Sequence, residues 1–317
     1  MDYKSLQKKI KNYAKKYRVK IIGKSFFKRN IFAVEKIVNS SFPTAIFLCS
    51  IHARENIATD LVCKMIDNGL FENIKDFNLS FILMANPDGV ELSKNGINSA
   101  PKKYRKSLEE INHKSLDFSL WKANGRGVDL NNNFNANFGT NVGSYFPSSS
   151  GYVGTKPESE PETKAILRYT KSLKTFLTIS FHTKGEEIYF NFFQKGWRLK
   201  RDKMIAEKFA KSTGYVIKNP ERSSSGGYKD FCVQKLKIPA LTIELGDDNL
   251  THPLGENSLP EIFEKNKNVA NDLIFSYNVF KEFEEKYGIW WKIYEKGNCA
   301  CKKSRASWWS SGWSRYC

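Results

Sequence analysis

Two apolar runs in this 317-residue chain end in side chains that commonly bind metal ions. Residues 44–51 lead directly into His52 and Glu55, and residues 176–181 lead into His182. Short, continuous apolar runs of this kind predict strands that are buried on both faces of a sheet. Because ligands at the ends of neighbouring strands can converge, we expect these three side chains to meet. Two imidazoles and one carboxylate form a common catalytic zinc site, which leaves a fourth position for water.

The spacing of His52 and Glu55 excludes two better-known zinc motifs. The helical H-E-x-x-H motif needs two histidines four positions apart, and here the pair is one histidine and one glutamate three apart. The inverted H-x-x-E-H motif needs a histidine directly after the glutamate, and Asn56 stands there instead. Taken alone, the pair also fits a buried hydrogen-bonded contact without a metal. The second cluster at His182 favours the metal site.

The rest of the chain alternates between helical and strand-like patterns. Helices are expected over residues 4–17, 55–68, 160–174, 200–213 and 259–286, and further strands over 19–22, 31–37, 79–85 and 240–245. This alternation predicts a single α/β/α domain with a mixed, mostly parallel central sheet that helices cover on both faces. Residues 88–158 are poor in regular pattern after a predicted turn at 86–89. A long irregular stretch in a compact domain usually carries function.

The formal net charge of +18 indicates attraction to anions, either acidic peptides or nucleic acid. The lysines are spread along the chain without a nucleic-acid motif, so nucleic-acid binding remains only an alternative. No secretory signal and no membrane-spanning run of about 18 apolar residues is visible. The six cysteines are scattered, which indicates reduced thiols. We therefore expect a cytoplasmic protein without a transmembrane segment.

Glu244 is a further candidate for chemistry because it lies in the apolar run 241–245. A carboxylate in such surroundings is costly unless it is paired or coordinated. Partial removal from water would raise its pKa and suit it to general-base catalysis. The alternative is an ordinary salt-bridged glutamate at the end of a strand.

With these residues in place, the chain resembles the zinc carboxypeptidase family over residues 1–287. The similar segments are His52-Ala53-Arg54-Glu55, Trp121-Lys122-Ala123-Asn124, Gly127-Val128-Asp129-Leu130-Asn131, His182, and Ser225-Gly226-Gly227 placed 18 residues before Glu244. The resemblance implies one Zn²⁺ per chain on His52, Glu55 and His182, and Glu244 as the catalytic base. It also implies that Lys122 stands where the family has an arginine facing the oxyanion. Arg54 and Asn131 are then expected to bind substrate.

Three positions depart from the family pattern and concern the substrate. Asn132 replaces the arginine that commonly clamps a terminal carboxylate, and a neutral amide lacks that charged fork. Arg222 falls near the tyrosine that often covers the bound substrate. Lys229 matches the floor of the pocket for the residue after the scissile bond. A lysine there would favour an acidic group on the substrate, and the alternative is a solvated side chain. Asn132, Arg222 and Lys229 complete the predicted substrate-binding set.

These departures resemble the bacterial γ-D-glutamyl-diaminopimelate peptidases, which trim cell-wall peptides. The resemblance implies a peptide substrate derived from peptidoglycan, a muropeptide. Two alternatives remain: an ordinary carboxypeptidase that removes C-terminal residues, and an inactive zinc-containing module that only binds peptides. Residues 288–317, rich in Trp, Cys and basic residues, are expected to form a tail outside the catalytic domain 1–287, possible roles being a surface for membrane or glycan or a disordered extension. The sequence does not predict the oligomeric state.

Overall fold

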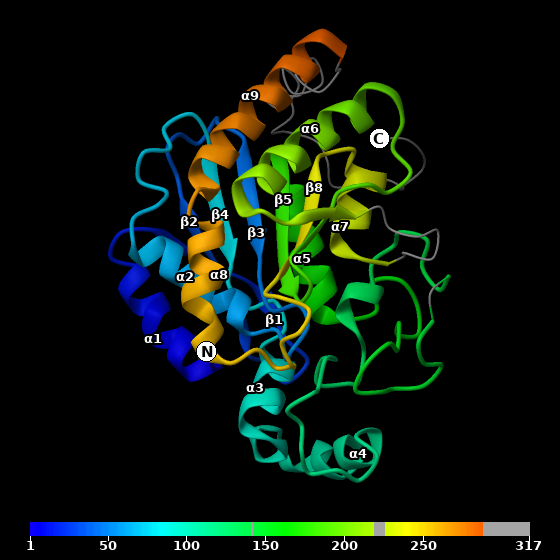
Figure 1. The fold of residues 1–317 in the computed structure, drawn as a ribbon. Coiled ribbons are helices and arrows are strands. Elements are labelled where there is room, and N and C mark those ends of the chain that lie inside the picture. The colour runs from blue at the N-terminus through cyan, green and yellow to red at the C-terminus, as the bar shows by residue number, and fades with distance from the viewer. Residues whose placement is uncertain (141, 219–225, 288–317) are drawn as a thin grey trace, which may run out of the picture.

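The computed structural model describes residues 1–140, 142–218 and 226–287 (Figure 1). The strands in these residues form one eight-stranded sheet in the order β1-β2-β4-β3-β5-β8-β6-β7. The central strands β4, β3, β5 and β8 are parallel, whereas β2 and β6 run antiparallel to β4 and β8. The strand bounds are β1 Arg18–Lys24, β2 Asn30–Lys36, β3 Thr44–Leu48, β4 Asn78–Ile82, β5 Thr175–Thr183, β6 Glu187–Tyr189, β7 Val216–Lys218 and β8 Ala240–Leu245. The predicted mixed sheet with a parallel centre is confirmed.

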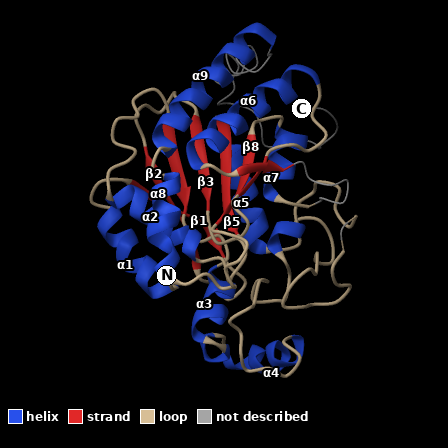
Figure 2. Cartoon of the chain, in the orientation of Figure 1, coloured by secondary structure: helices blue, strands red, loops and turns tan. Residues whose placement is uncertain are grey.

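Helices cover both faces of this sheet (Figure 2). One apolar core includes residues of α1 Tyr3–Tyr13, α2 Ile57–Asp67, α6 Gly196–Thr213, α8 Leu259–Asn266 and α9 Val269–Tyr287. A second core includes residues of α5 Pro161–Ser172 and α7 Tyr228–Phe231. The helices α3 Pro87–Asn95 and α4 Lys102–Ile111 lie below the sheet in Figure 1. The α/β/α architecture therefore agrees with the prediction.

Strand β3 shows why the central strands read as continuous apolar runs. Successive side chains of a strand point to opposite faces. Ala45 and Phe47 pack into the core that contains α2, whereas Ile46 and Leu48 pack into the core that contains α5. All four are at most 1% exposed. Because both faces of β3 are buried, Ala45 to Leu48 form a continuous apolar run without the polar alternation of a half-buried strand.

The segment 88–158 contains more regular structure than predicted. The cluster at 86–89, predicted as a turn, starts helix α3: the Asn86 side chain accepts a hydrogen bond from the Gly89 N–H at 3.0 Å, and Pro87 occupies the first turn. Asparagine caps helices well and proline fits their first turn, so the same residues serve a turn or a helix start. Helix α4 was missed although Tyr104, Leu108 and Ile111 recur at helical spacing; most of its other residues are charged, and only Leu108 is buried.

The last predicted helix, over 259–286, is two helices. Helix α8 ends at Asn266, whose buried amide donates to the Ile262 carbonyl at 2.9 Å and to the Tyr215 hydroxyl at 3.1 Å. Helix α9 then begins at Val269. The predicted tail, residues 288–317, lies outside the described residues.

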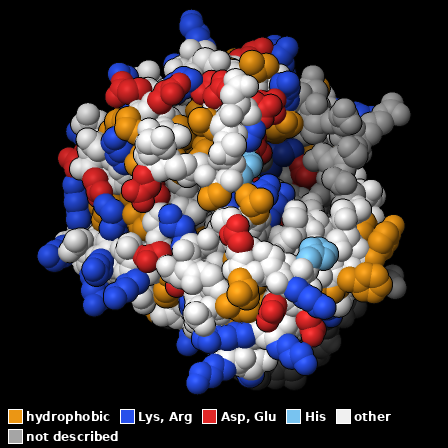
Figure 3. Space-filling view, turned by 60° about the horizontal axis from the view of Figure 1, so that its bottom comes forward, with side chains coloured by type: hydrophobic (Ala, Val, Ile, Leu, Met, Phe, Trp, Pro, Cys, Tyr) orange, Lys and Arg blue, Asp and Glu red, His pale blue; other side chains and the backbone are white. Residues whose placement is uncertain are grey.

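Charged side chains of both signs are interspersed on the face that Figure 3 shows, and no continuous basic stripe crosses it. This distribution gives no support to nucleic-acid binding through that face. Within the described residues, no helix combines the length and apolar character needed to cross a bilayer.

Helices α6 and α9 are joined by a buried ion-pair cluster. Arg201, which is 0% exposed, contacts Asp202 Oδ1 at 2.8 Å and Glu284 Oε1 at 2.7 Å. Its guanidinium also lies 5.3 Å from the Trp197 ring centroid. Removing one member of such a cluster leaves the others charged and buried without their partner.

We predict that Arg201→Ala lowers the free energy of unfolding by about 3–5 kcal/mol, because Asp202 and Glu284 lose their buried partner. Urea unfolding followed by circular dichroism measures the change. Lys203→Ala on the same helix is the control, since the exposed Lys203–Glu207 pair, 3.6 Å apart, should contribute less than about 1 kcal/mol. Equal losses in the two variants would contradict the assignment.

Candidate metal centre and active site

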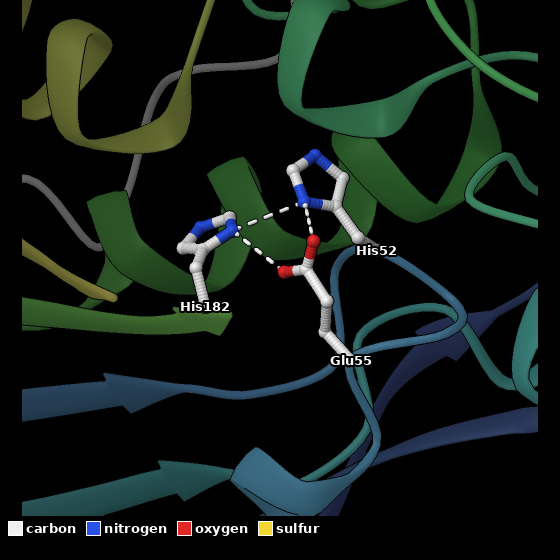
Figure 4. Close-up of side chains that lie close together, drawn as sticks. All are labelled: His52, Glu55 and His182. Atoms are coloured by element: carbon white, nitrogen blue, oxygen red, sulfur yellow. Dashed lines mark hydrogen bonds and ion pairs between the residues drawn. The ribbon is translucent and has the colours of Figure 1, made fainter. Parts of the chain in front are cut away.

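Three predicted ligands meet at the carboxyl edge of the parallel strands. His52 and Glu55 lie in the connection from β3 to α2, and His182 lies near the end of β5. Strands β3 and β5 are parallel neighbours with Leu48 opposite Ser180, so the residues that follow reach the same edge. Figure 4 shows the three side chains pointing toward one another. Each is buried, with at most 6% exposed.

The distances among these side chains fit a metal ion. His52 Nδ1 lies 2.9 Å from Glu55 Oε1, and His182 Nδ1 lies 3.0 Å from Glu55 Oε2. The two Nδ1 atoms are 3.1 Å apart. One ligand atom from each of the three residues lies within 4.8 Å of the other two. In the described part of the chain, this is the one group of three or more His, Cys, Asp or Glu side chains that could hold a metal ion. Converging lone pairs repel unless a cation or protons lie between them, and this donor set is one that zinc prefers.

A fourth buried side chain, Asp129, supports His52 from behind. Asp129 Oδ1 lies 3.3 Å from His52 Nε2, the ring nitrogen on the far side from the ligand cluster. A ring nitrogen that faces a carboxylate carries the proton, which leaves Nδ1 to offer its lone pair. Asp129 also accepts backbone N–H bonds from Asn131 at 3.2 Å and Gly151 at 3.3 Å. This arrangement orients the imidazole as a ligand.

The charges in the cluster stabilise one another. Burial alone would raise the pKa of the Glu55 carboxyl, but His52 and His182 hold it well below its usual value. Burial likewise opposes a charge on His52, yet Glu55 and Asp129 raise its pKa. The pKa of Asp129 is lowered against the effect of burial by Lys122 and His52. The site therefore keeps the Glu55 and Asp129 carboxylates ionised next to positive charge, and ionised carboxylates are what a divalent cation requires.

Glu244 and Lys122 flank the ligand cluster. Glu244 lies on β8 opposite His182 of β5, in parallel register. Burial raises the pKa of its carboxyl to about 7, with the nearby Glu55 charge adding to the effect and His182 opposing it. Lys122 Nζ lies 3.4 Å from Asp129 Oδ2, and Asp129 and Glu55 raise its pKa although burial lowers it. A carboxyl group and an ammonium group thus lie near the cluster.

The predicted substrate-binding residues are only partly brought together. The Asn131 side chain is used locally, since its Oδ1 accepts the Tyr228 N–H at 3.1 Å. Gly226, with φ near +78°, packs so closely on Asn132 that a Cβ would lie 2.7 Å from the Asn132 carbonyl oxygen. The loops 129–132 and 226–230 therefore form one wall. Arg54 donates to the Leu120 carbonyl at 3.4 Å, and the predicted Arg222 lies outside the described residues.

Lys229 is not the solvated side chain that was the alternative expectation. It is 6% exposed, and its ammonium pairs with Asp230 and donates to the Asn191 carbonyl at 3.0 Å. The Nζ atom also lies 5.3 Å from the Phe192 ring centroid. The predicted cation is present, but its charge is shared with a neighbouring carboxylate.

Residues 3–269 match the family described as zinc carboxypeptidase, which covers most of the chain. The chain belongs to the zinc carboxypeptidase family. It is 31% identical over 228 residues to γ-D-glutamyl-L-diamino acid endopeptidase 1 of Lysinibacillus sphaericus, covering 66% of this chain and 56% of that protein. It is 29% identical over 258 residues to the protein YqgT of Bacillus subtilis, covering 75% of this chain and 65% of that one. The chain thus spans less than two thirds of either relative.

Solved structures show the same fold. Bovine thrombin-activatable fibrinolysis inhibitor superposes with a TM-score of 0.69 at 20% identity, covering 89% of this chain and 98% of that chain. Murein-tripeptide amidase MpaA from Escherichia coli O157 superposes with a TM-score of 0.54 at 18% identity, covering 81% and 91%. These likenesses establish the carboxypeptidase-like fold of the chain.

The support that Asp129 gives to His52 was not predicted from the sequence. Asp129 was quoted within Gly127-Val128-Asp129-Leu130-Asn131, but no function was given to it. Its partner His52 lies 77 positions earlier, so no local pattern joins the two. The available signal was an acidic residue in a motif shared with the family, close to Lys122. His252 contacts the Thr183 carbonyl at 3.0 Å and lies outside the ligand cluster.

We predict that Asp129→Asn weakens zinc affinity about 10- to 100-fold, because His52 loses the carboxylate that orients it. Competition with a chromophoric chelator measures the affinity. Asp117→Asn serves as the control, since Asp117 is an exposed carboxylate whose bond to the Ser119 N–H is local. Unchanged zinc affinity in Asp129→Asn would show that Asp129 does not support the metal site.

Proposed function

We propose that this protein is a zinc-dependent peptidase that hydrolyses the bond between γ-D-glutamate and a diamino acid in cell-wall-derived peptides. The observation that carries hydrolysis is the convergence of His52, Glu55 and His182 beside Glu244. The name of the Lysinibacillus relative and the asparagine at position 132 support the substrate class. The proposal includes one Zn²⁺ per chain, supported by the single ligand cluster among the described residues.

The proposed roles follow from the chemistry of each side chain. Zinc held by two imidazoles and a carboxylate supplies Lewis acidity and a water activated near neutral pH. Glu244 accepts a proton from the attacking water and returns it to the leaving amine, a task for which a pKa near 7 is well suited. Lys122 places its ammonium toward the oxygen that gains negative charge. Asp129 holds both His52 and Lys122 in place.

Substrate recognition is proposed to depend on several polar groups rather than one arginine clamp. At position 132 the chain has an amide, which can hydrogen-bond but cannot supply the bidentate charged contact that a terminal carboxylate prefers. Arg54 and Lys229 offer positive charge, and Asn131 shapes the wall between them through Tyr228. Arg222, which lies outside the described residues, stays in the proposed substrate-binding set because of its position in the sequence. This composition favours a ligand with more than one ionised group.

The substrate is tested with two peptides and the zinc-loaded protein. L-Ala-γ-D-Glu-diaminopimelate should be split at the bond to the diamino acid, whereas a blocked dipeptide ending in Phe should stay intact. Mass spectrometry identifies the products. Cleavage of the Phe dipeptide alone, abolished when its terminal carboxylate is amidated, would identify an ordinary carboxypeptidase. No cleavage of either peptide by zinc-loaded protein would leave a binding module.

We predict that Glu244→Gln retains zinc and lowers kcat by about 10²- to 10⁴-fold, because the amide cannot accept the water's proton. Initial rates with the cleaved peptide and metal analysis of the same sample give both quantities. A Glu244→Gln variant that turns over at the wild-type rate would refute the base assignment. Loss of zinc in that variant would instead place Glu244 among the ligands.

A further inference from the structure

The turn that carries Lys122 and Asp129 is built around one buried asparagine. Asn124 is 0% exposed and lies between the two residues in sequence. Its Oδ1 accepts the N–H groups of Arg126 at 2.9 Å and Val128 at 3.1 Å, and its backbone carbonyl accepts the Trp121 indole N–H at 3.2 Å. Its own N–H donates to the Val128 carbonyl at 2.8 Å. Asn124 therefore fixes the backbone on both sides of itself.

The same turn is tied to the metal-ligand loop. The Ala53 N–H, next to His52, donates to the Lys122 carbonyl at 3.1 Å. The buried Asn86 amide bridges the carbonyls of Ala123, at 3.0 Å, and Ile51, at 3.2 Å. These bonds fix the backbone of Lys122 relative to the loop that carries His52.

Two buried carboxyl groups hold Asn124 from the other side. The Asn124 amide Nδ2 donates to Glu160 Oε2 at 2.9 Å and to Glu162 Oε2 at 3.3 Å. Glu160 and Glu162 are at most 1% exposed, and Glu162 also accepts the Phe26 N–H at 2.9 Å. Burying two carboxyl groups is costly, and a fold that needed only a filled core could use apolar side chains here. The pair provides the two acceptors that an amide NH₂ requires.

We propose that Asn124, anchored by Glu160 and Glu162, is a positioning residue that sets the location of Lys122 relative to Asp129 and the metal ligands. This inference rests on the proposed function, because it concerns the role of Lys122 at the reacting carbonyl. Lysine is a point charge on a flexible four-carbon chain, so the placement of the Lys122 ammonium depends on the backbone of Lys122 and on its ion pair with Asp129. That pair, Lys122 Nζ to Asp129 Oδ2, spans the turn that Asn124 holds. A misplacement of about 1 Å can cost about 10²-fold in rate.

The chain offers a matched control for deleting this side chain. Asn78 is 3% exposed and clamps a turn at the opposite edge of the sheet, where β4 begins. Its Oδ1 accepts from Val38 at 2.8 Å, and its Nδ2 donates to the carbonyls of Asn39 at 2.8 Å and Phe42 at 3.0 Å. Asn124→Ala and Asn78→Ala therefore remove the same chemical groups from two buried turns. Both should lower the melting temperature, but only one lies beside the site.

The decisive experiment is a double-mutant cycle on kcat with the cleaved peptide. Asn124→Ala should lower kcat about 10- to 100-fold with zinc content unchanged, and Asn78→Ala should leave kcat within about threefold. In a Lys122→Ala background, Asn124→Ala should cause almost no further loss, because the two residues act through one group. Losses that multiply in the double variant, or an equal loss in Asn78→Ala, would overturn the proposal.

Two further measurements test the proposal even if Asn124→Ala does not fold or the protein does not cleave the peptide. If Asn124→Ala does not fold, Glu160→Ala replaces it in the cycle, and Glu160→Gln, which retains an acceptor for Asn124, should recover most of the lost kcat. A crystal structure of the asparagine or glutamate variant should show Lys122 displaced from Asp129 while His52, Glu55 and His182 stay together. If Lys122 is not displaced in the variant, the positioning role is refuted, whether or not the protein cleaves a peptide. If Lys122 is displaced in the variant but the wild-type protein cleaves no peptide, only the proposed function is refuted.

Discussion

The buried carboxylate of Asp129 is the interaction on which the rest of the site depends. It lies between the imidazole of His52 and the ammonium of Lys122, and it is 1% exposed. A buried anion of this kind is tolerated only with well-placed partners, and each partner here also has a place in the proposed chemistry. The positions of His52, the proposed metal ligand, and Lys122, the proposed oxyanion contact, are therefore not independent. A change in the position of either is transmitted to the other through this carboxylate.

The chemistry is divided between rigid strands and a loop that is held from several sides. His182 and Glu244 lie on neighbouring parallel strands, and register alone places them side by side. Lys122 and Asp129 lie on a turn, which has no register to fix it. The position of the turn is set instead by hydrogen bonds among buried amides and carboxyl groups. These directional bonds give the turn the rigidity that a strand gains from its sheet. This difference explains why polar groups are concentrated behind the turn, where the surrounding fold would otherwise favour apolar packing.

The sequence predicted the sheet and the ligand cluster because both depend on local patterns. Strand β3 is buried on two faces, so it reads as an unbroken apolar run, and its end marks where His52 must lie. Helix α4 was missed although Tyr104, Leu108 and Ile111 recur at helical spacing, because these three stand among six charged residues and only Leu108 is buried. The support of His52 by Asp129 was also out of reach, since it depends on the packing of two loops. Directional contacts between distant loops leave no periodic trace in a sequence.

Lys229, which was predicted to lie at the floor of a substrate pocket, has a different electrostatic environment from the one expected. Position 229 was expected to hold either a cation that favours an acidic substrate group or a solvated lysine, but the Lys229 ammonium is paired with Asp230 and bonded to the Asn191 carbonyl. An acidic group alone would have to compete with that carboxylate for the ammonium. A side chain that carries both an amine and a carboxylate complements an ion pair better, because each of its charges can meet an opposite one. For the proposed substrate, a diamino acid with its extra carboxylate therefore suits the Lys229–Asp230 pair better than a simple acidic residue. A purely apolar side chain would exclude water from this buried pair and offer it no polar partner in return.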